Sequence, residues 1–432
     1  MLKNKFWIKI LLITLVAILI LPTFCLADDS VYVWSTETNP LNDTTQTSSN
    51  VVSANTDSAT TSTNNTISTN ATNSTSLNLN CGGAILIEQH SGQVLYEQNM
   101  HEQLRPASVT KVMSILLIME AIDSGKLSYT DKIPCTENAA GMGGSQIWLD
   151  VREELTVDEM LKAICVVSAN DCTVAMAEYL AGSQEAFVEQ MNAKAQELGM
   201  NDTTFKNCHG IDEDGHVTSA YDIALMSREL LNNHPNIIKY TTIYMDSLRD
   251  GKSSLVNTNK LIRNYKGATG LKTGSTSVAL YNLSASATRD DLSLIAVIMK
   301  APTGAIRFTE AQKLLDYGFN NFQYKKLANK NDVVKSVTVN KGIESAVNGI
   351  LENDCGVLIQ KGQDKNIEQT IELPDVIQAP IAEGQIMGTV IYTLNGEEVG
   401  KVNIIAENSV AKNSAFNMIE SIYAKWFSLL RE

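Results

Sequence analysis

Residues 105–122 read RPASVTKVMSILLIMEAI, a proline-led turn that runs directly into an apolar helix pattern. From residue 112 onward the large apolar residues recur at helical spacing, and Gly125 follows as a stop signal. The pattern predicts a helix over residues 108–122, with Ser108 in its first turn and Lys111 three positions later on the same face. A helix N-terminus offers unpaired backbone N–H groups and a positive partial charge, which would favour an alkoxide at Ser108.

Strand patterns flank this helix on both sides. Short apolar runs predict strands over residues 84–87, 94–96, 271–273, 283–288 and 292–299. Helical periodicity between and after them, with a capping box at Thr156 and Glu159, predicts helices over residues 157–167, 171–180, 185–198 and 306–317. Strands on either side of a helical middle predict an α+β fold in which helices pack on one antiparallel sheet.

The chain begins with two segments that lie outside this fold. Residues 1–27 combine a basic start, a short apolar run and small residues at positions -3 and -1 of a cut after Ala27, which is the pattern of a secretory signal peptide. We therefore expect export to the outer face of the cytoplasmic membrane or the cell wall. Residues 28–80 are predicted to be a disordered linker, because 28 of the 40 residues from 41 to 80 are Ser, Thr or Asn.

Two further segments follow the α+β domain, which we assign to residues 81–325. Residues 326–408 contain short alternating runs separated by turns such as Asn395-Gly396, and they predict a small all-β domain. Residues 409–432 carry apolar and aromatic residues at helical spacing near the terminus, Trp426 among them. They predict an amphipathic helix on a membrane surface, with a helix docked on its own protein as the alternative.

Composition excludes some classes of ligand. The chain has 432 residues and a net charge of -14, so it is unsuited to bind nucleic acid. His209 and His216 flank two aspartates but match no zinc spacing, and an ordering role in a loop is expected for them. We expect neither a metal nor a cofactor.

The six cysteines after the signal form no CxxC pair. Small buried thiols are the favoured interpretation, although export would permit disulfides.

Three short motifs carry candidate chemistry. In Ser108-Val109-Thr110-Lys111, the lysine can remove the serine proton only as a neutral amine. Its pKa, ordinarily about 10.4, must therefore be lowered by burial or by a second cation. In Ser168-Ala169-Asn170, which falls in a turn between two predicted helices, Ser168 can relay a proton. Asn170 can orient Lys111 and hold a substrate carbonyl.

The third motif is Lys272-Thr273-Gly274, on a predicted edge strand. Gly274 lets a substrate backbone approach, because it has no side chain. Lys272 supplies the second cation near Lys111, and together with Thr273 it suits a substrate carboxylate. The backbone N–H groups of Ser108 and Ser275 are the expected oxyanion hole.

In this order and context, the three motifs are the set of the penicillin-recognising serine enzymes. The chain from Cys81 to Phe322 resembles the D-alanyl-D-alanine carboxypeptidases, the low-molecular-mass penicillin-binding proteins. The small β domain and the C-terminal helix are similar to theirs as well. The matching stretches are residues 105–111, 168–171, 187–192, 257–260 and 270–276.

This resemblance implies a substrate and a set of roles. The substrate would be a peptidoglycan stem peptide ending in D-Ala-D-Ala, and β-lactam antibiotics would acylate the same serine. The implied catalytic residues are Ser108, Lys111, Ser168 and Asn170. The implied substrate-binding residues are Lys272, Thr273, Gly274, Ser275 and Thr276. Ser293 would stand where many relatives carry an arginine that helps to bind the substrate carboxylate.

Two alternatives remain open at this stage. The first is a β-lactamase of the same fold, which the accessory β domain and the terminal helix disfavour. Glu189 lies inside a predicted amphipathic helix, too early in the chain to act as the deacylating glutamate of that class. The second is a catalytically silent wall-binding protein, which the intact motifs disfavour.

Overall fold

The computed structural model describes residues 77–414 and Trp426. The predicted signal peptide, almost all of the predicted linker and nearly all of the C-terminal helix lie outside the described residues. Within the last segment, Val410 forms a bridge with Ile381 and Lys412 forms one with Gly342, and Trp426 is helical with 59% of its surface exposed. No helix among the described residues has the length and apolar character needed to cross a membrane.

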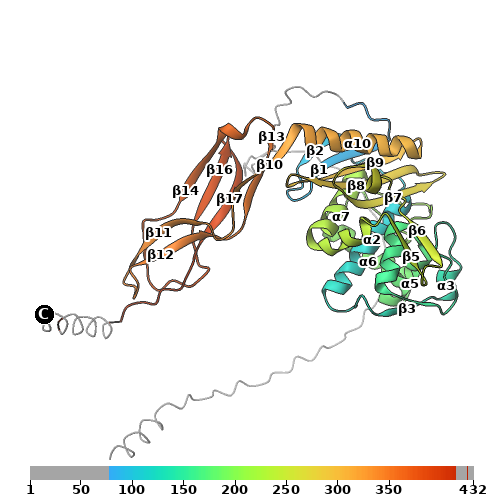
Figure 1. Cartoon of the computed structure of the whole chain (residues 1–432), viewed down its shortest axis with the longest axis horizontal. Coiled ribbons are helices and arrows are strands. Elements are labelled where there is room, and N and C mark those ends of the chain that lie inside the picture. Colours follow the sequence, from blue (N-terminus) through green and yellow to red (C-terminus); the bar gives the residue numbers. More distant parts are fainter. Residues whose placement is uncertain (1–76, 415–425, 427–432) are drawn as a thin grey trace, which may run out of the picture. The chain divides into compact units, whose positions relative to one another are not determined.

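A five-stranded sheet forms the centre of the first part (Figure 1). Its order is β2-β1-β9-β8-β7, and every neighbouring pair is antiparallel. Pairs of consecutive strands supply most of this order, because β1 pairs with β2, β7 pairs with β8 and β8 pairs with β9. The strands are β1 (Gly83–Glu88), β2 (Val94–Gln98), β7 (Ala268–Thr276), β8 (Leu280–Arg289) and β9 (Leu292–Ala301).

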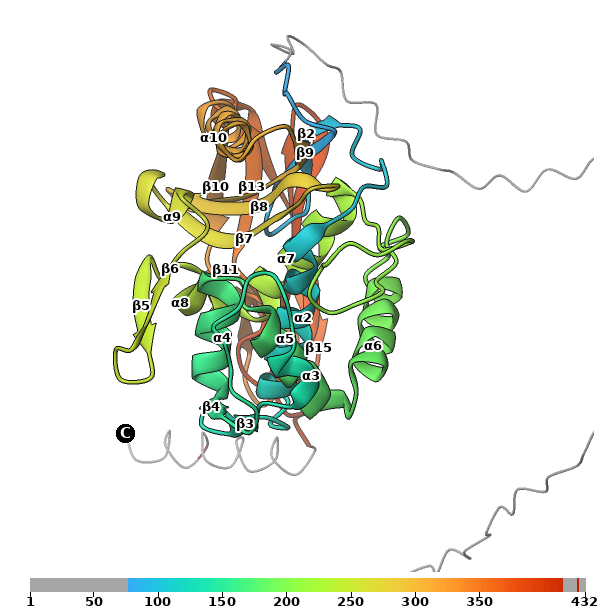
Figure 2. The same ribbon diagram turned by 90° about the vertical axis from the view of Figure 1, so that its right-hand side faces the viewer.

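Helices cover both faces of this sheet. Along β9, Ile295 and Val297 belong to one apolar core while Leu294 and Ala296 belong to another, as expected because successive side chains point to opposite faces. The second core includes α10 (Gly304–Asn321), which Figure 2 shows on the opposite side of the sheet from the other long helices. These are α2 (Lys111–Asp123), α4 (Val157–Val166), α5 (Asn170–Ala181), α6 (Gln184–Glu197) and α7 (Ala220–Asn233).

The helix boundaries follow local signals. Thr156 and Glu159 form the predicted capping box at the start of α4, and Gly182 ends α5 with a φ of 85°. Sequence and structure agree on the main elements, and the α+β fold is confirmed. The shorter elements are η1 (Ala107–Thr110), β3 (Lys132–Pro134), α3 (Glu137–Ala140), β4 (Glu154–Thr156), η2 (Pro235–Ile237), α8 (Ile238–Thr241), β5 (Met245–Leu248), β6 (Ser253–Val256) and α9 (Leu261–Asn264).

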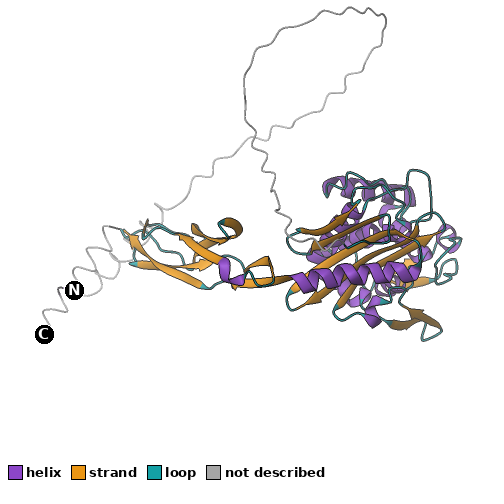
Figure 3. Ribbon diagram, turned by 90° about the horizontal axis from the view of Figure 1, so that it is seen from above, coloured by secondary structure: helices purple, strands orange, loops and turns teal. Residues whose placement is uncertain are grey.

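After α10 the chain becomes β-rich, as predicted; Figure 3 shows almost only strands in this part. A six-stranded sheet has the order β14-β16-β17-β12-β11-β15, and β10 pairs with β13. Asn395 and Gly396 make the β16–β17 turn, with φ of 54° and 86°. The elements are β10 (Phe322–Ala328), β11 (Val333–Asn340), β12 (Ala346–Leu351), β13 (Cys355–Gln360), η3 (Asp364–Asn366), β14 (Ile367–Glu372), β15 (Val376–Gln378), β16 (Ile386–Leu394) and β17 (Glu397–Ala406).

The cysteines of the described part are unpaired thiols. Five of the six are buried, and only Cys81 is partly exposed. Burial raises the pKa of Cys165 and of Cys208 to about 12. These thiols therefore stay protonated and act as small apolar side chains, as the sequence predicts.

Candidate active site

The turn that carries Ser108 is held between two glycines. A Cβ on Gly274 of β7 would lie 2.8 Å from the carbonyl oxygen of Pro106 and 2.9 Å from the backbone nitrogen of Ser108. A Cβ on Gly210 would overlap the carbonyl oxygen of Ala107, and Gly210 has a φ of 91° that other residues rarely adopt. Because only residues without side chains allow this close packing, both glycines fix the position of Ser108.

Lys111 is fully buried one turn after Ser108, at the start of α2. Its Nζ donates to Asn170 Oδ1 and to the carbonyl oxygen of His209, both at 2.6 Å, and lies 3.2 Å from Ser108 Oγ. Burial lowers the pKa of Lys111 well below its ordinary value, and the positive charge of Lys272 lowers it further. The lysine is thereby driven toward the neutral amine.

The neutral form of Lys111 fits these contacts. A neutral amine has two N–H donors and one lone pair. Asn170 Oδ1 and the carbonyl of His209 accept only, so the two short contacts use both donors. The lone pair is then left for the hydroxyl proton of Ser108, which is the direction of proton transfer that activates the serine.

Asn170 is the first residue of α5, and its orientation is fixed by backbone carbonyls. Its Nδ2 donates to the carbonyl oxygen of Gly143 and its backbone N–H donates to that of Ser145, both at 2.7 Å. The Nδ2 contact with Gly143 assigns Oδ1 as the atom that faces Lys111, and the backbone contact with Ser145 fixes the start of α5. The loop before β4 therefore sets the geometry of the lysine through Asn170.

Ser168 lies at the junction between α4 and α5. It is 4% exposed, it has a φ of 66°, and its hydroxyl has no hydrogen-bond partner among the residues that the structure describes. A strained backbone that holds an unpaired buried hydroxyl is uncommon, and such positions cluster at functional sites. The hydroxyl is free to pass a proton once a substrate is present.

Strand β7 presents the Lys-Thr-Gly motif at the edge of the sheet. Lys272 is buried; its Nζ donates to the carbonyl oxygen of Thr273 at 2.9 Å, and burial lowers its pKa to about 7. The hydroxyl of Thr273 lies 2.8 Å from that of Thr258. Ser275 is exposed, whereas Thr276 Oγ1 accepts from the backbone N–H of Ala279.

The structure brings part of the predicted site into direct contact, whereas the hydroxyl of Ser168 has no partner among the described residues. Ser108, Lys111 and Asn170 are joined by direct contacts, and Gly274 packs on the turn of Ser108. In the part of the chain that the structure describes, no group of three or more His, Cys, Asp or Glu side chains is placed to hold a metal ion.

Comparison with known proteins identifies the family. Residues 68–303, more than half of the chain, match the family model of the D-alanyl-D-alanine carboxypeptidases. The chain belongs to the D-alanyl-D-alanine carboxypeptidase family. Residues 322–412 match the model of the penicillin-binding protein 5 C-terminal domain.

Named relatives span both parts of the chain. The D-alanyl-D-alanine carboxypeptidase DacF of Bacillus subtilis is 43% identical over 79% of this chain and 89% of its own length. Penicillin-binding protein 5 of Haemophilus influenzae has a solved structure that is 32% identical, with a TM-score of 0.67 over 77% of this chain and 98% of that one. Penicillin-binding protein D2 of Listeria monocytogenes, solved in its ampicillin-bound form, is 30% identical with a TM-score of 0.52 over 56% of this chain and 99% of that one.

The carboxypeptidase fold corrects one expectation about the carboxylate-binding arginine. Ser293 pairs with Thr288 near the β8–β9 turn, where their hydroxyls lie 2.8 Å apart. Gly274 pairs with Asn282 near the opposite end of β8, so Ser293 lies far from the motif. The arginine beside the motif is instead Arg307, which the sequence analysis missed. It is 8% exposed and donates to the carbonyl oxygens of Gly274 and Asn282, both at 3.1 Å.

Two contacts in the site left no sign in the sequence, whereas the role of one histidine was indicated correctly. Arg307 reads as an ordinary residue of an amphipathic helix, and only the packing of α10 on β8 brings it to β7. The carbonyl of His209 gives no signal in a side-chain pattern. The ordering role of His216 is confirmed, because Nδ1 accepts from the backbone N–H of Lys206 and Nε2 lies 2.8 Å from Thr110 Oγ1.

Proposed function

We propose that this family member removes the terminal D-alanine from peptidoglycan stem peptides through an acyl-enzyme on Ser108. The observation that carries the proposal is the contact set of Lys111, a buried lysine with a lowered pKa whose lone pair faces the Ser108 hydroxyl. Family membership supplies the substrate class, because the named relatives are D-alanyl-D-alanine carboxypeptidases.

Acylation begins when Ser108 Oγ attacks the carbonyl carbon between the two D-alanines. The hydroxyl proton moves to Lys111 Nζ as the new C–O bond forms. The backbone N–H groups of Ser108 and Ser275 stabilise the oxyanion. The proton then passes through the Ser168 hydroxyl to the amine of the leaving D-alanine as the C–N bond breaks, which leaves an ester on Ser108.

Deacylation returns the enzyme to its starting state. A water molecule attacks the ester carbonyl and gives its proton to Lys111 or Ser168, and Ser108 Oγ takes a proton as it leaves. The products are D-alanine and a shortened peptide with a new carboxylate. The same sequence applied to a β-lactam opens the lactam ring, and the amine stays tethered in the acyl-enzyme.

Substrate binding is assigned to β7. The edge of this strand can pair with an extended peptide. The missing side chain of Gly274 gives room to the Ser108 turn and not, as the sequence suggested, to the peptide backbone. Lys272 provides positive charge for the terminal carboxylate, and the hydroxyls of Thr273, Ser275 and Thr276 are available as donors. Arg307 lies beneath the strand and adds a second positive charge.

We also propose where the enzyme works. Residues 1–27 act as an export signal, residues 28–80 as a tether, and residues 409–432 as a helix on the outer face of the cytoplasmic membrane. The signal-peptide pattern, the linker composition and the exposure of Trp426 support this arrangement. Sedimentation with anionic lipid vesicles would test the last segment: loss of binding after removal of residues 415–432 supports it, and unchanged binding opposes it.

The test of the activity is D-alanine release from a short acyl-D-Ala-D-Ala peptide. The full chain should release D-alanine, and its Ser108→Ala variant should not. If neither protein released D-alanine, the carboxypeptidase proposal would fail. Rapid turnover of penicillin by the wild-type chain would instead favour the β-lactamase alternative. Among the described residues, the polar contacts of Ser108 and Lys111 include no carboxylate, so the structure gives no reason to prefer that alternative.

A further inference from the structure

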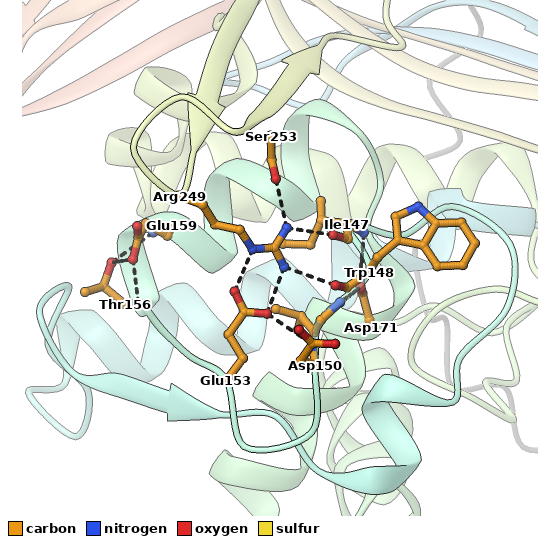
Figure 4. Close-up of polar contacts among 10 residues, drawn as sticks. Ile147, Trp148, Asp150, Glu153, Thr156, Glu159, Asp171, Arg249 and Ser253 are labelled. Carbon is orange, nitrogen blue, oxygen red and sulfur yellow. Dashed lines mark hydrogen bonds and ion pairs between the residues drawn. The ribbon is translucent and has the colours of Figure 1, made fainter.

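Arg249 occupies the turn between β5 and β6 and uses every N–H donor of its guanidinium group (Figure 4). Nε and Nη2 donate to the two carboxylate oxygens of Glu153 at 2.6 and 2.9 Å. Nη1 donates to Ser253 Oγ at 2.8 Å and to the carbonyl oxygen of Ile147 at 2.9 Å, and Nη2 also donates to that of Trp148 at 3.2 Å. Because the guanidinium group is planar and all its donors are used, it fixes the positions of these four partners relative to one another.

Arg249 contacts the segment of residues 143–149, and this segment needs support from other parts of the chain. Trp148 is 75% exposed and has a φ of 60°, which is uncommon for a bulky side chain. The backbone N–H groups of Ile147 and Leu149 both donate to the carboxylate of Asp171, at 3.0 and 3.2 Å (Figure 4). The segment is therefore fixed by Asp171 through its amides and by Arg249 through its carbonyls.

This segment leads directly to the catalytic lysine. Its first residues, Gly143 and Ser145, supply the two carbonyls that orient Asn170. Asn170 in turn accepts the 2.6 Å hydrogen bond from Lys111. A continuous series of contacts thus runs from the guanidinium group of Arg249, through residues 143–149, to the base that activates Ser108.

We propose that Arg249 is a positioning residue for acylation: it fixes residues 143–149 against Asn170 and thereby keeps Lys111 directed at Ser108. The proposal rests on the proposed function, because it concerns the same Ser108 reaction. Among the described residues, Arg249 has no hydrogen bond to Ser108 or Lys111, so its effect on them is indirect and is expected to pass through this segment. A small displacement of catalytic groups is enough to reduce a rate substantially.

The matched control is Arg289. Its side chain is as buried as that of Arg249, with 24% against 22% of its surface exposed, and it likewise combines an acidic partner with a backbone carbonyl. It pairs with Asp316 and donates to the carbonyl oxygen of Lys266. Its place at the end of β8 beyond Ala287 keeps it away from the Ser108 turn.

The experiment compares the full chain with Arg249→Gln, Arg249→Lys, Glu153→Gln and Arg289→Gln. It measures the rate constant of acylation by a fluorescent penicillin, kcat and KM for release of D-alanine, and hydrogen exchange at the amides of Ile147 and Leu149. R249Q should acylate about tenfold more slowly, with faster exchange at both amides and little change in KM. R249K should recover part of the rate, and E153Q should stay within about threefold of wild type because the carbonyl contacts of Arg249 persist.

Several results would overturn the inference. One is an R249Q rate equal to that of the wild type, and another is an equal loss in R289Q, which would mark a general effect of removing a surface arginine. If R249Q does not fold, R249K and E153Q decide: a wild-type rate in R249K together with faster exchange would show that the segment is not coupled to Lys111. An inactive wild-type chain would overturn the proposed function, and the inference with it.

Discussion

Lys111 Nζ and Asn170 Oδ1 lie 2.6 Å apart, although the two residues are 59 positions apart in the chain. The contact joins the start of α2 to the start of α5, and the carbonyl of His209 occupies the second donor of the amine at the same distance. The remaining lone pair faces Ser108. This geometry explains how a lysine, whose ordinary pKa is about 10.4, can serve as the base in a serine peptidase.

Replacing Lys272 by Gln should shift the pH dependence of acylation. Lys272 helps to lower the pKa of Lys111, so loss of its charge raises that pKa and reduces the neutral fraction at a given pH. The pH at which penicillin acylation reaches half its maximal rate should therefore move upward. Thr273→Ser keeps both charges and should leave the midpoint in place; a K272Q midpoint that stayed put or moved downward would contradict the role of Lys272.

Replacing Ser168 by Ala should separate activity from stability. The hydroxyl of Ser168 has no partner among the described residues, so its removal breaks no hydrogen bond and should change the free energy of unfolding by less than about 0.5 kcal/mol. If the hydroxyl relays a proton, kcat should fall by about 10²- to 10³-fold. Denaturant unfolding and D-alanine release measure the two quantities. A variant with wild-type kcat would remove Ser168 from the mechanism.

Gly274→Ala should impair catalysis by displacing the nucleophile. The new methyl group would press on the carbonyl of Pro106 and the backbone nitrogen of Ser108, neither of which can move without shifting the turn. We expect kcat/KM to fall about 100-fold or more. Gly304→Ala is the control, because its nearest neighbours lie at an ordinary 3.4 Å from the added carbon. Equal activity of the two variants would argue against close packing at Gly274.

Stability should fall as the pH drops below about 6.5, the ordinary pKa of histidine. Burial lowers the pKa of His216 to about 4 and that of His209 to about 3. Between these values and 6.5 the unfolded chain binds protons that the folded chain does not, so protonation favours unfolding. Each imidazole contributes up to about 1.4 kcal/mol per pH unit in that window.

The control for this effect is His216→Gln, which keeps a donor and an acceptor but does not titrate. Chemical unfolding of both proteins from pH 4 to pH 7 should show a shallower fall in the variant. Parallel curves for the two proteins would mean that His216 is protonated in the folded state as readily as in the unfolded one.

The sequence predicts those parts of the fold and site that depend on local pattern. The helix after Ser108 follows from apolar spacing, the capping box at Thr156 from side-chain chemistry, and the β16–β17 turn from Asn395 and Gly396. The three motifs could be grouped because each has a recognisable order of residue types.

Other features depend on contacts between distant segments. Arg307 is brought beneath β7 by the packing of α10, so its position in the sequence gives no indication that it lies near the motif. The sequence analysis instead placed the position of the carboxylate-binding arginine at Ser293. Three contacts in the site are made by backbone carbonyls, those of Gly143, Ser145 and His209. Such contacts do not depend on side-chain type, so side-chain patterns cannot predict them. Arg249 reads as a turn residue until its five donors are placed in space.

The most direct test of the central claim is to treat the full chain with penicillin and to locate the covalent adduct by peptide mapping with mass spectrometry. The account predicts one adduct per chain on Ser108, no adduct in Ser108→Ala, and markedly slower formation in Lys111→Ala. An adduct on another residue, or labelling of Ser108→Ala at the wild-type rate, would contradict the assignment of Ser108 as the nucleophile and Lys111 as its base.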